Sequence, residues 1–166
     1  MIYKPTNTLK NLKKLEQRKN VYFQTGVFGS DDSEIIKIAA IHEFGGEIKI
    51  KKNRYVPVLG VTLKAGTIIT MPERKWLTIA FERNRDVIDK IIKSNLKKIG
   101  DGKLTIDDSN EIIALALSSL TKKEMGKEVM QPKYRKGTPM VDSGRLRQSI
   151  GTKVNLKGKT KGYGEG

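Results

Sequence analysis

Few residues in this 166-residue chain could carry out chemistry. Histidine occurs once, at His42, and cysteine is absent. Without cysteine there is no disulfide framework, thiolate nucleophile or cysteine zinc site, and a metalloprotease helix needs two histidines four residues apart. A serine-histidine-aspartate triad within one chain would have to recruit His42. The composition therefore argues against most classes of enzyme, and we expect neither catalytic residues nor a metal nor a cofactor.

His42 is followed directly by Glu43, and this pair could act as a general base with an orienting acid. No nucleophile is recognisable nearby, so we expect a structural role for the histidine. In this interpretation His42 is buried, donates a hydrogen bond to a backbone carbonyl, and locks a helix end against the turn at Gly45 and Gly46.

Two other motifs are better explained by structure than by chemistry. The acidic pairs Asp31-Asp32 and Asp107-Asp108 each directly precede a helical pattern, where carboxylates cap free N–H groups and complement the helix dipole. Gly158-Lys159-Thr160 looks like the end of a phosphate-binding loop, but that loop needs a further glycine where this chain has Lys153. We interpret the pairs as caps and the triplet as accidental.

The chain carries a formal net charge of +15, which favours an anionic partner such as nucleic acid or an acidic protein surface. The positive excess lies at both ends and in residues 47–75, whereas residues 31–46 and 101–130 are net acidic. The alternatives are a solvated lysine-rich surface and, on the strands, protection of an edge against unwanted pairing. Hydrophobic residues make up 37% and contain no bilayer-spanning run, so we expect no membrane association.

Three large side chains are candidates for contact with a partner. Trp76 follows Arg74 and Lys75 at an expected helix start, where it either anchors that helix in the core or forms a docking patch. Arg145 and Arg147 are two residues apart, so they point away from each other if the segment is helical and share a face only if it is extended.

Hydrophobic spacing in the first half predicts two short helices, a strand and a hairpin. The helices cover residues 7–19 and about 33–43, and the strand covers 21–28. In the second helix, with Asp31 as its cap, we expect Ile35, Ile38, Ala39 and His42 on one face. Residues 47–70 read as two or three strands that form an extended hairpin.

The second half predicts two long helices and a late strand. Pro72 suits a first helical turn, and a long helix follows from Lys75 to about Ile99. A second helix, capped by Asp108, runs to around Val129 and is apolar on several sides, so we expect it to be central and buried. A basic loop covers 131–139, Asp142 or Ser143 caps one turn through Gln148, and residues 150–156 form a strand. Residues 1–156 are expected to form one domain, followed by a disordered basic tail over 157–166.

Three short signatures in this order resemble the tail-completion, or neck, family of tailed bacteriophages. They are the stretches Ile41–Gly46, Met71–Leu77 and Val141–Ile150. The positions that match the family pattern are His42, Gly45, Gly46, Pro72, Arg74, Trp76, Leu77, Ser143, Gly144, Leu146, Ser149 and Ile150. The resemblance implies an α+β fold, with a small antiparallel sheet packed against two main helices, an extended β-hairpin and no catalytic residues.

The function implied is that of a structural virion protein, made in the cytoplasm of the host bacterium and incorporated into the neck. Copies would form a ring that completes the tail and joins it to the head connector, with other neck and tail proteins as partners; DNA contact is compatible but not required. The residues expected at these interfaces are Lys49, Lys51, Lys52, Arg54, Arg74, Trp76, Arg145 and Arg147. One candidate contact pairs the acidic 31–46 helix with the basic hairpin of the next copy. The alternative function is a basic protein that contacts the phosphate backbone of nucleic acid.

Overall fold

The computed structural model describes residues 9–10, 13, 21–28, 33–56, 60–127, 144–156 and 159–163. In chain order the elements are β1 (Val21–Val27), α2 (Ser33–Phe44), β2 (Gly46–Lys49), β3 (Arg54–Val56), β4 (Val61–Leu63), β5 (Ile68–Met71), α3 (Trp76–Gly100), α4 (Ile106–Met125), α5 (Arg145–Gln148), β6 (Ile150–Leu156) and β7 (Lys159–Tyr163). The helix expected over 7–19 falls outside the described residues except at positions 9, 10 and 13. The expected loop 131–139 and the expected caps Asp31, Asp142 and Ser143 also lie outside them.

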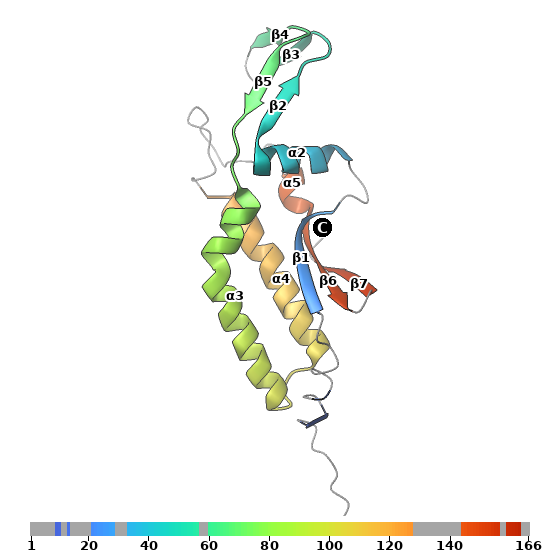
Figure 1. Cartoon of the computed structure of the whole chain (residues 1–166), viewed down its shortest axis with the longest axis vertical. Coiled ribbons are helices and arrows are strands. Elements are labelled where there is room, and N and C mark those ends of the chain that lie inside the picture. The colour runs from blue at the N-terminus through green and yellow to red at the C-terminus, as the bar shows by residue number, and fades with distance from the viewer. Residues whose placement is uncertain are drawn as a thin grey trace, which may run out of the picture.

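A three-stranded antiparallel sheet, ordered β1-β6-β7, forms one layer of the body. β6 is central and pairs with β1 along its whole length, from Val27 opposite Ile150 to Val21 opposite Leu156. Ile150, Thr152 and Val154 alternate along β6 and are fully buried, as expected for the face of a strand that meets a helix. That helix is α4 (Figure 1).

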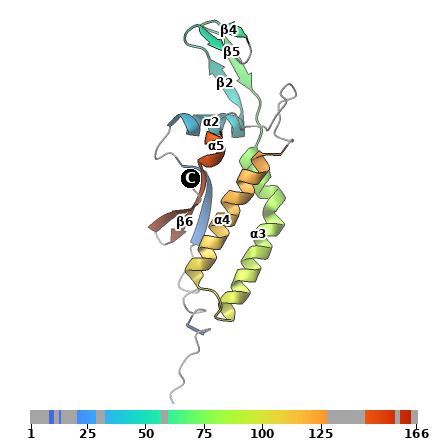
Figure 2. The same ribbon diagram turned by 180° about the vertical axis from the view of Figure 1, so that it is seen from behind.

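The two long helices α3 and α4 form an antiparallel pair, and α4 lies between α3 and the sheet (Figures 1 and 2). Ile88 of α3 packs against Ile113 and Leu117 of α4, with Phe23 of β1 beside them. Half of α4 is buried, including Ser118 and Thr121, whose hydroxyls donate to backbone carbonyls within the helix. The α+β class and the central position of this helix are therefore as the sequence predicts.

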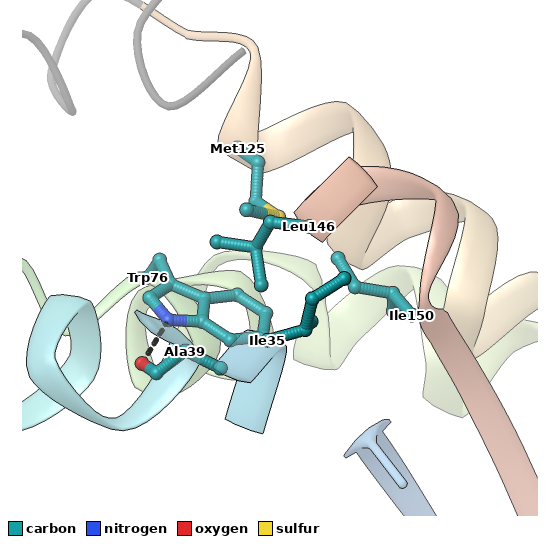
Figure 3. Packing of buried hydrophobic residues seen from close by; sticks show 6 residues of the cluster. All are labelled: Ile35, Ala39, Trp76, Met125, Leu146 and Ile150. Carbon is teal, nitrogen blue, oxygen red and sulfur yellow. Dashed lines mark hydrogen bonds between the residues drawn. The ribbon is translucent and has the colours of Figure 1, made fainter. Parts of the chain in front are cut away.

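A second core cluster joins the body at the end where α2 and α5 lie (Figure 3). It brings together side chains from five elements: Ile35, Ala39, Trp76, Met125, Leu146 and Ile150. This cluster holds the short helices α2 and α5 on the start of α3 and the end of α4. It also fixes the point from which the chain leaves the body to form the hairpin.

Residues 46–56 and 60–71 form a long two-stranded hairpin, which we call the arm, and it projects beyond α2 at one end of the molecule (Figure 1). Its inner ladder pairs β2 with β5 and its outer ladder pairs β3 with β4. Between the ladders the chain turns at Gly66 (φ +89°), and Asn53 Oδ1 accepts a 2.8 Å hydrogen bond from the backbone of Ala65. The extended hairpin is present, with four short strands where two or three were expected.

Several local expectations were wrong. Thr105, not Asp108, caps α4: its hydroxyl accepts from the Asp108 backbone at 3.1 Å and donates to the Asp108 carboxylate at 2.6 Å. Pro72 lies before α3 and outside its first turn, because the helix begins at Trp76. Gly144 occupies the N-terminal cap position of α5 without a side-chain bond. Residues 159–163 form strand β7 on the free edge of β6, where a disordered tail was expected.

Candidate assembly interface

The junction between α2 and α3, at the base of the arm, is organised by Glu43. Its buried carboxylate accepts hydrogen bonds from the backbone N–H of Leu77 (2.7 Å) and of Thr78 (3.2 Å), and from the Thr78 hydroxyl (2.6 Å). These N–H groups belong to the first turn of α3, which has no intrahelical acceptor for them. The N-terminal cap residue of α3, Lys75, makes no side-chain cap bond. A side chain from α2 therefore supplies the missing cap.

The backbone tightens the same junction. The carbonyls of His42 and Glu43 accept hydrogen bonds from the N–H groups of Arg74 (3.0 Å) and Lys75 (3.2 Å). Gly45 has a φ of +72°, and a Cβ at this position would lie 2.9 Å from Glu73 N. Only glycine fits, because the positive φ and the close approach of the returning strand both exclude a side chain. The expected structural role of Gly45 is thus explained, and Gly46 also has a positive φ, of +156°.

His42 does not make the bond expected of its side chain. Its Nδ1 is buried without a hydrogen-bond partner among the described residues, and only its backbone carbonyl ties the helix end. Burial, with the nearby charge of Arg74, lowers the pKa of His42 below its ordinary value. The buried face of α2 consists of Ile35, Ala39 and Glu43, so the expected face with Ile38 and His42 was wrong.

Trp76 is a core residue. Its side chain is only 2% exposed, and its indole N–H donates to the Ala39 carbonyl at 3.2 Å (Figure 3). A side chain buried this deeply within one subunit cannot line a docking surface, so the expectation of an interface role was wrong and that of a core anchor was right. Trp76 and Glu43 together fix the direction of α3 relative to α2.

The remaining expected interface residues lie in three separate places. Lys49, Lys51, Lys52 and Arg54 are exposed on the arm. Arg74 is half-buried at the junction beside His42. Arg145 and Arg147 are exposed on the helical turn α5, so they do not share a face, and Arg147 adds to the effect of burial in lowering the pKa of Lys122. The structure therefore gathers the basic side chains of the arm and leaves the other arginines apart.

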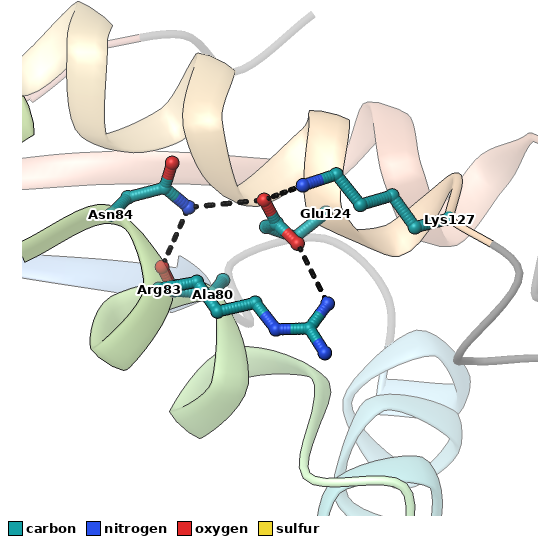
Figure 4. Close-up of polar contacts among 5 residues, drawn as sticks. All are labelled: Ala80, Arg83, Asn84, Glu124 and Lys127. Atoms are coloured by element: carbon teal, nitrogen blue, oxygen red, sulfur yellow. Dashed lines mark hydrogen bonds and ion pairs between the residues drawn. The ribbon is translucent and has the colours of Figure 1, made fainter.

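An ionic cluster centred on the buried Glu124 joins α3 to α4 near the junction (Figure 4). Glu124 is 2% exposed; its Oε1 accepts hydrogen bonds from Lys127 and from Asn84 (3.3 Å), and its Oε2 faces Arg83 at 3.5 Å. Burial raises the pKa of Glu124, but the hydrogen bonds and positive charges of these neighbours outweigh it and lower the pKa overall. The cluster is explained by helix packing, since Asn84 also donates to the Ala80 carbonyl within α3.

The arm carries the most distinctive surface of the described structure. Its exposed large apolar side chains are Ile48, Tyr55, Val61 and Ile68, and its basic side chains are Lys49, Lys51, Lys52, Arg54 and Lys64. None of the described arm residues belongs to either core cluster. A surface that is apolar and charged at once, on a projecting element, is typical of a protein–protein contact.

Sequence reasoning missed the role of Glu43 because its partners lie more than thirty positions away along the chain. A signal was available: the long helix begins without a Ser, Thr, Asp or Asn at the position before Trp76.

Among the described residues no group of His, Cys, Asp and Glu is arranged to hold a metal ion. No helix in those parts of the chain has the length and apolar character needed to cross a bilayer. Comparisons with protein families, characterised proteins and solved structures find no match to this chain.

Proposed function

We propose that this chain is a structural subunit of the neck of a tailed bacteriophage. In the virion, copies form a ring that completes the tail and joins it to the head connector. The protein acts through its shape: a packed body presents the arm to neighbouring subunits, and no reaction is carried out. Its partners are other copies and the adjoining connector and tail proteins.

The observation that carries this proposal is the arm. A two-stranded hairpin is marginally stable in water by itself, and additional strands or a packed face normally support it. Here the hairpin extends from the Glu43 junction, whose hydrogen bonds hold its base on the body, and it exposes apolar side chains such as Tyr55 and Val61. An apolar and basic projection with a hydrogen-bonded base suits an element that reaches into a neighbouring molecule. The resemblance of Ile41–Gly46, Met71–Leu77 and Val141–Ile150 to neck proteins supplies the identity of the assembly.

Deletion of the reading frame from its phage tests the proposal. We expect full heads beside finished but unattached tails in electron micrographs of the lysate, and restored particles when the wild-type chain is supplied from a plasmid. Intact infectious particles without the protein would contradict the proposal.

A second complementing chain separates the arm from the body. Because Lys49 and Ile68 are directly opposite in the inner ladder, an Asn-Gly turn can replace residues 50–67 and close the shortened hairpin. This variant should fold and fail to restore particles. Restoration by the shortened chain would show that the arm is dispensable.

Contact with the phosphate backbone of nucleic acid is the second candidate function. The observation that favours it is a group of exposed lysines on the C-terminal half of α3: Lys90, Lys93, Lys97 and Lys98. Binding of this kind weakens steeply as salt rises, because bound counterions are released. Strong retention of duplex DNA that is lost between low and physiological salt, and lost when these lysines are replaced by glutamine, would favour this function.

A further inference from the structure

One face of the outer ladder of the arm has the composition of a docking surface. Residues opposite each other in an antiparallel pair share a face, so Arg54, Val56, Val61 and Leu63 lie on one side, and Tyr55 and Thr62 lie on the other. Val61 is 47% exposed, and Arg54 is its diagonal neighbour on this face, because Val61 is opposite Val56 and Arg54 is opposite Leu63. This face needs a partner that is both apolar and acidic.

Two arms do not meet this requirement. The described part of the arm carries five basic side chains and one acidic one, Glu47, so two arms face to face would bring like charges together. A contact between the outer parts of two arms would therefore be opposed by electrostatic repulsion.

The acidic helix α2 does not meet it either. Of its two glutamates, Glu43 is buried and bonded to the start of α3, and the remaining charges on α2 are Glu34 and Lys37. One of the carboxylates that make residues 31–46 net acidic, that of Glu43, is therefore bonded within its own subunit. Asp31 and Asp32 lie outside the described residues, so the described part of α2 offers the arm of the next copy one exposed carboxylate, that of Glu34, beside the positive charge of Lys37.

The outer side of α4 has both properties. Ile112 and Leu115 are 40% and 43% exposed, and Asp108 and Glu111 lie exposed beside them at helical spacing. Lys161 of β7 lies near Glu111 and offsets part of its charge. α3 also exposes apolar side chains, Phe81 and Val87, close to acidic ones. Its exposed acidic residues Glu82, Asp86 and Asp89 are interspersed with the exposed basic residues Arg83, Arg85 and Lys90, so that surface has no acidic excess to attract the basic arm.

The two surfaces lie at different ends of the molecule. The arm projects beyond α2, whereas α4 begins at the opposite end, after its turn from α3 (Figures 1 and 2). An arm that docked on the α4 side would therefore join two different copies through unlike surfaces. Contacts of this heterologous kind repeat from copy to copy and close into a ring or extend as a filament.

We propose that the Arg54–Val61 face of the arm docks on the Glu111, Ile112 and Leu115 side of α4 in the next copy. This inference deepens the proposed function and names the surfaces that join neighbouring subunits. Val61 contacts the exposed pair on α4, and Arg54 lies against Glu111 and Asp108. The contact is apolar at its centre and charged at its rim, as in other specific interfaces.

A mixing experiment with two variants tests the contact in solution. The arm variant is Val61→Glu, and the α4 variant is Leu115→Lys. We expect the wild-type chain to form oligomers in analytical ultracentrifugation, and each variant alone to remain monomeric. Mixed together, they should form a one-to-one dimer and nothing larger, because one intact arm meets one intact α4 side. Circular dichroism establishes that each variant is folded.

Matched controls lie close to each change. Thr62→Glu places the same charge on the opposite face of the arm, and Leu96→Lys makes the same change on an exposed leucine of α3. Both controls should assemble like the wild type. If Thr62→Glu abolished assembly, the docking face would lie on the Tyr55 side, which would contradict the proposed contact.

Three results would overturn the inference: a wild-type chain that stays monomeric at its highest soluble concentration, a Leu115→Lys variant that still assembles, or a mixture that does not pair. If the Val61→Glu variant lost DNA binding but still self-associated, the arm would be assigned to nucleic acid and the inference would be overturned.

The proposed function is tested by a different result. It fails if deletion of the reading frame leaves intact particles, whereas the inference alone fails if Leu115→Lys restores particles as well as the wild type does.

Discussion

The carboxylate of Glu43 accepts a 2.7 Å hydrogen bond from the backbone N–H of Leu77, so the last turn of α2 caps the first turn of α3. This bond connects the helix before the arm to the helix after it. It therefore fixes both ends of the arm at one point of the body, where the core residue Trp76 lies as well.

Replacement of Glu43 by glutamine should destabilise the protein measurably. Both carboxylate oxygens accept hydrogen bonds, and an amide group would turn a donor toward one of the N–H groups of Leu77 and Thr78. We expect a loss of about 1–3 kcal/mol in the free energy of unfolding, measured by urea titration. The exposed Glu47 on β2 provides the control, because Glu47→Gln should change the stability by less than about 0.5 kcal/mol. Equal effects of the two changes would remove the capping role.

Alanine at position 45 should be far more damaging than alanine at position 66. Both glycines have positive φ angles, +72° and +89°, so both substitutions carry the strain of that conformation, about 1 kcal/mol. A Cβ at position 45 would also lie 2.9 Å from Glu73 N, whereas nothing lies within 4 Å of one at position 66. Gly45→Ala should therefore lower the thermal midpoint well below that of Gly66→Ala. Similar midpoints would show that the junction can relax.

Trp76 is the only tryptophan of the chain, so its fluorescence reports the core directly. Because the indole is buried, we expect blue-shifted emission that is protected from acrylamide and unchanged when the protein assembles. A variant with Trp76→Phe and Tyr55→Trp moves the reporter to the exposed tip of the arm, where emission should be red-shifted and open to quenching. If acrylamide quenched the Trp76 emission of the folded protein as readily as that of the urea-unfolded protein, the burial of Trp76 would be contradicted. Replacement by phenylalanine should reduce the free energy of unfolding by about 1–3 kcal/mol.

The elements that depend on local pattern follow from the sequence. β1, α2, α3 and β6 lie within one or two residues of their expected limits, because apolar spacing and breaking glycines act at short range. What sequence reasoning missed depends on neighbours distant in the chain. The segment that contains β7 is rich in lysine and glycine and forms a strand beside the free edge of β6. Glu43 seemed to belong with His42, yet its partners are on α3. The basic surface of the arm was expected from the sequence, whereas the burial of Glu43, one of the carboxylates of residues 31–46, was not.

Stability should fall in acid partly through Glu124. Its pKa in the folded protein is lowered from the ordinary value of 4.5, so the unfolded chain binds its proton first as the pH falls. The stabilisation is complete above that ordinary value and is lost as the pH drops through the lower folded value. Glu124→Gln should thus cost about 1–2 kcal/mol at neutral pH, toward the lower end because Arg83 and Lys127 are partly solvent-exposed, and much less near pH 3. Urea titrations of both proteins at the two pH values measure this difference, with the exposed Glu82→Gln on α3 as the control. A deficit of equal size at both pH values would mean that Glu124 acts through packing alone, since packing does not depend on its charge.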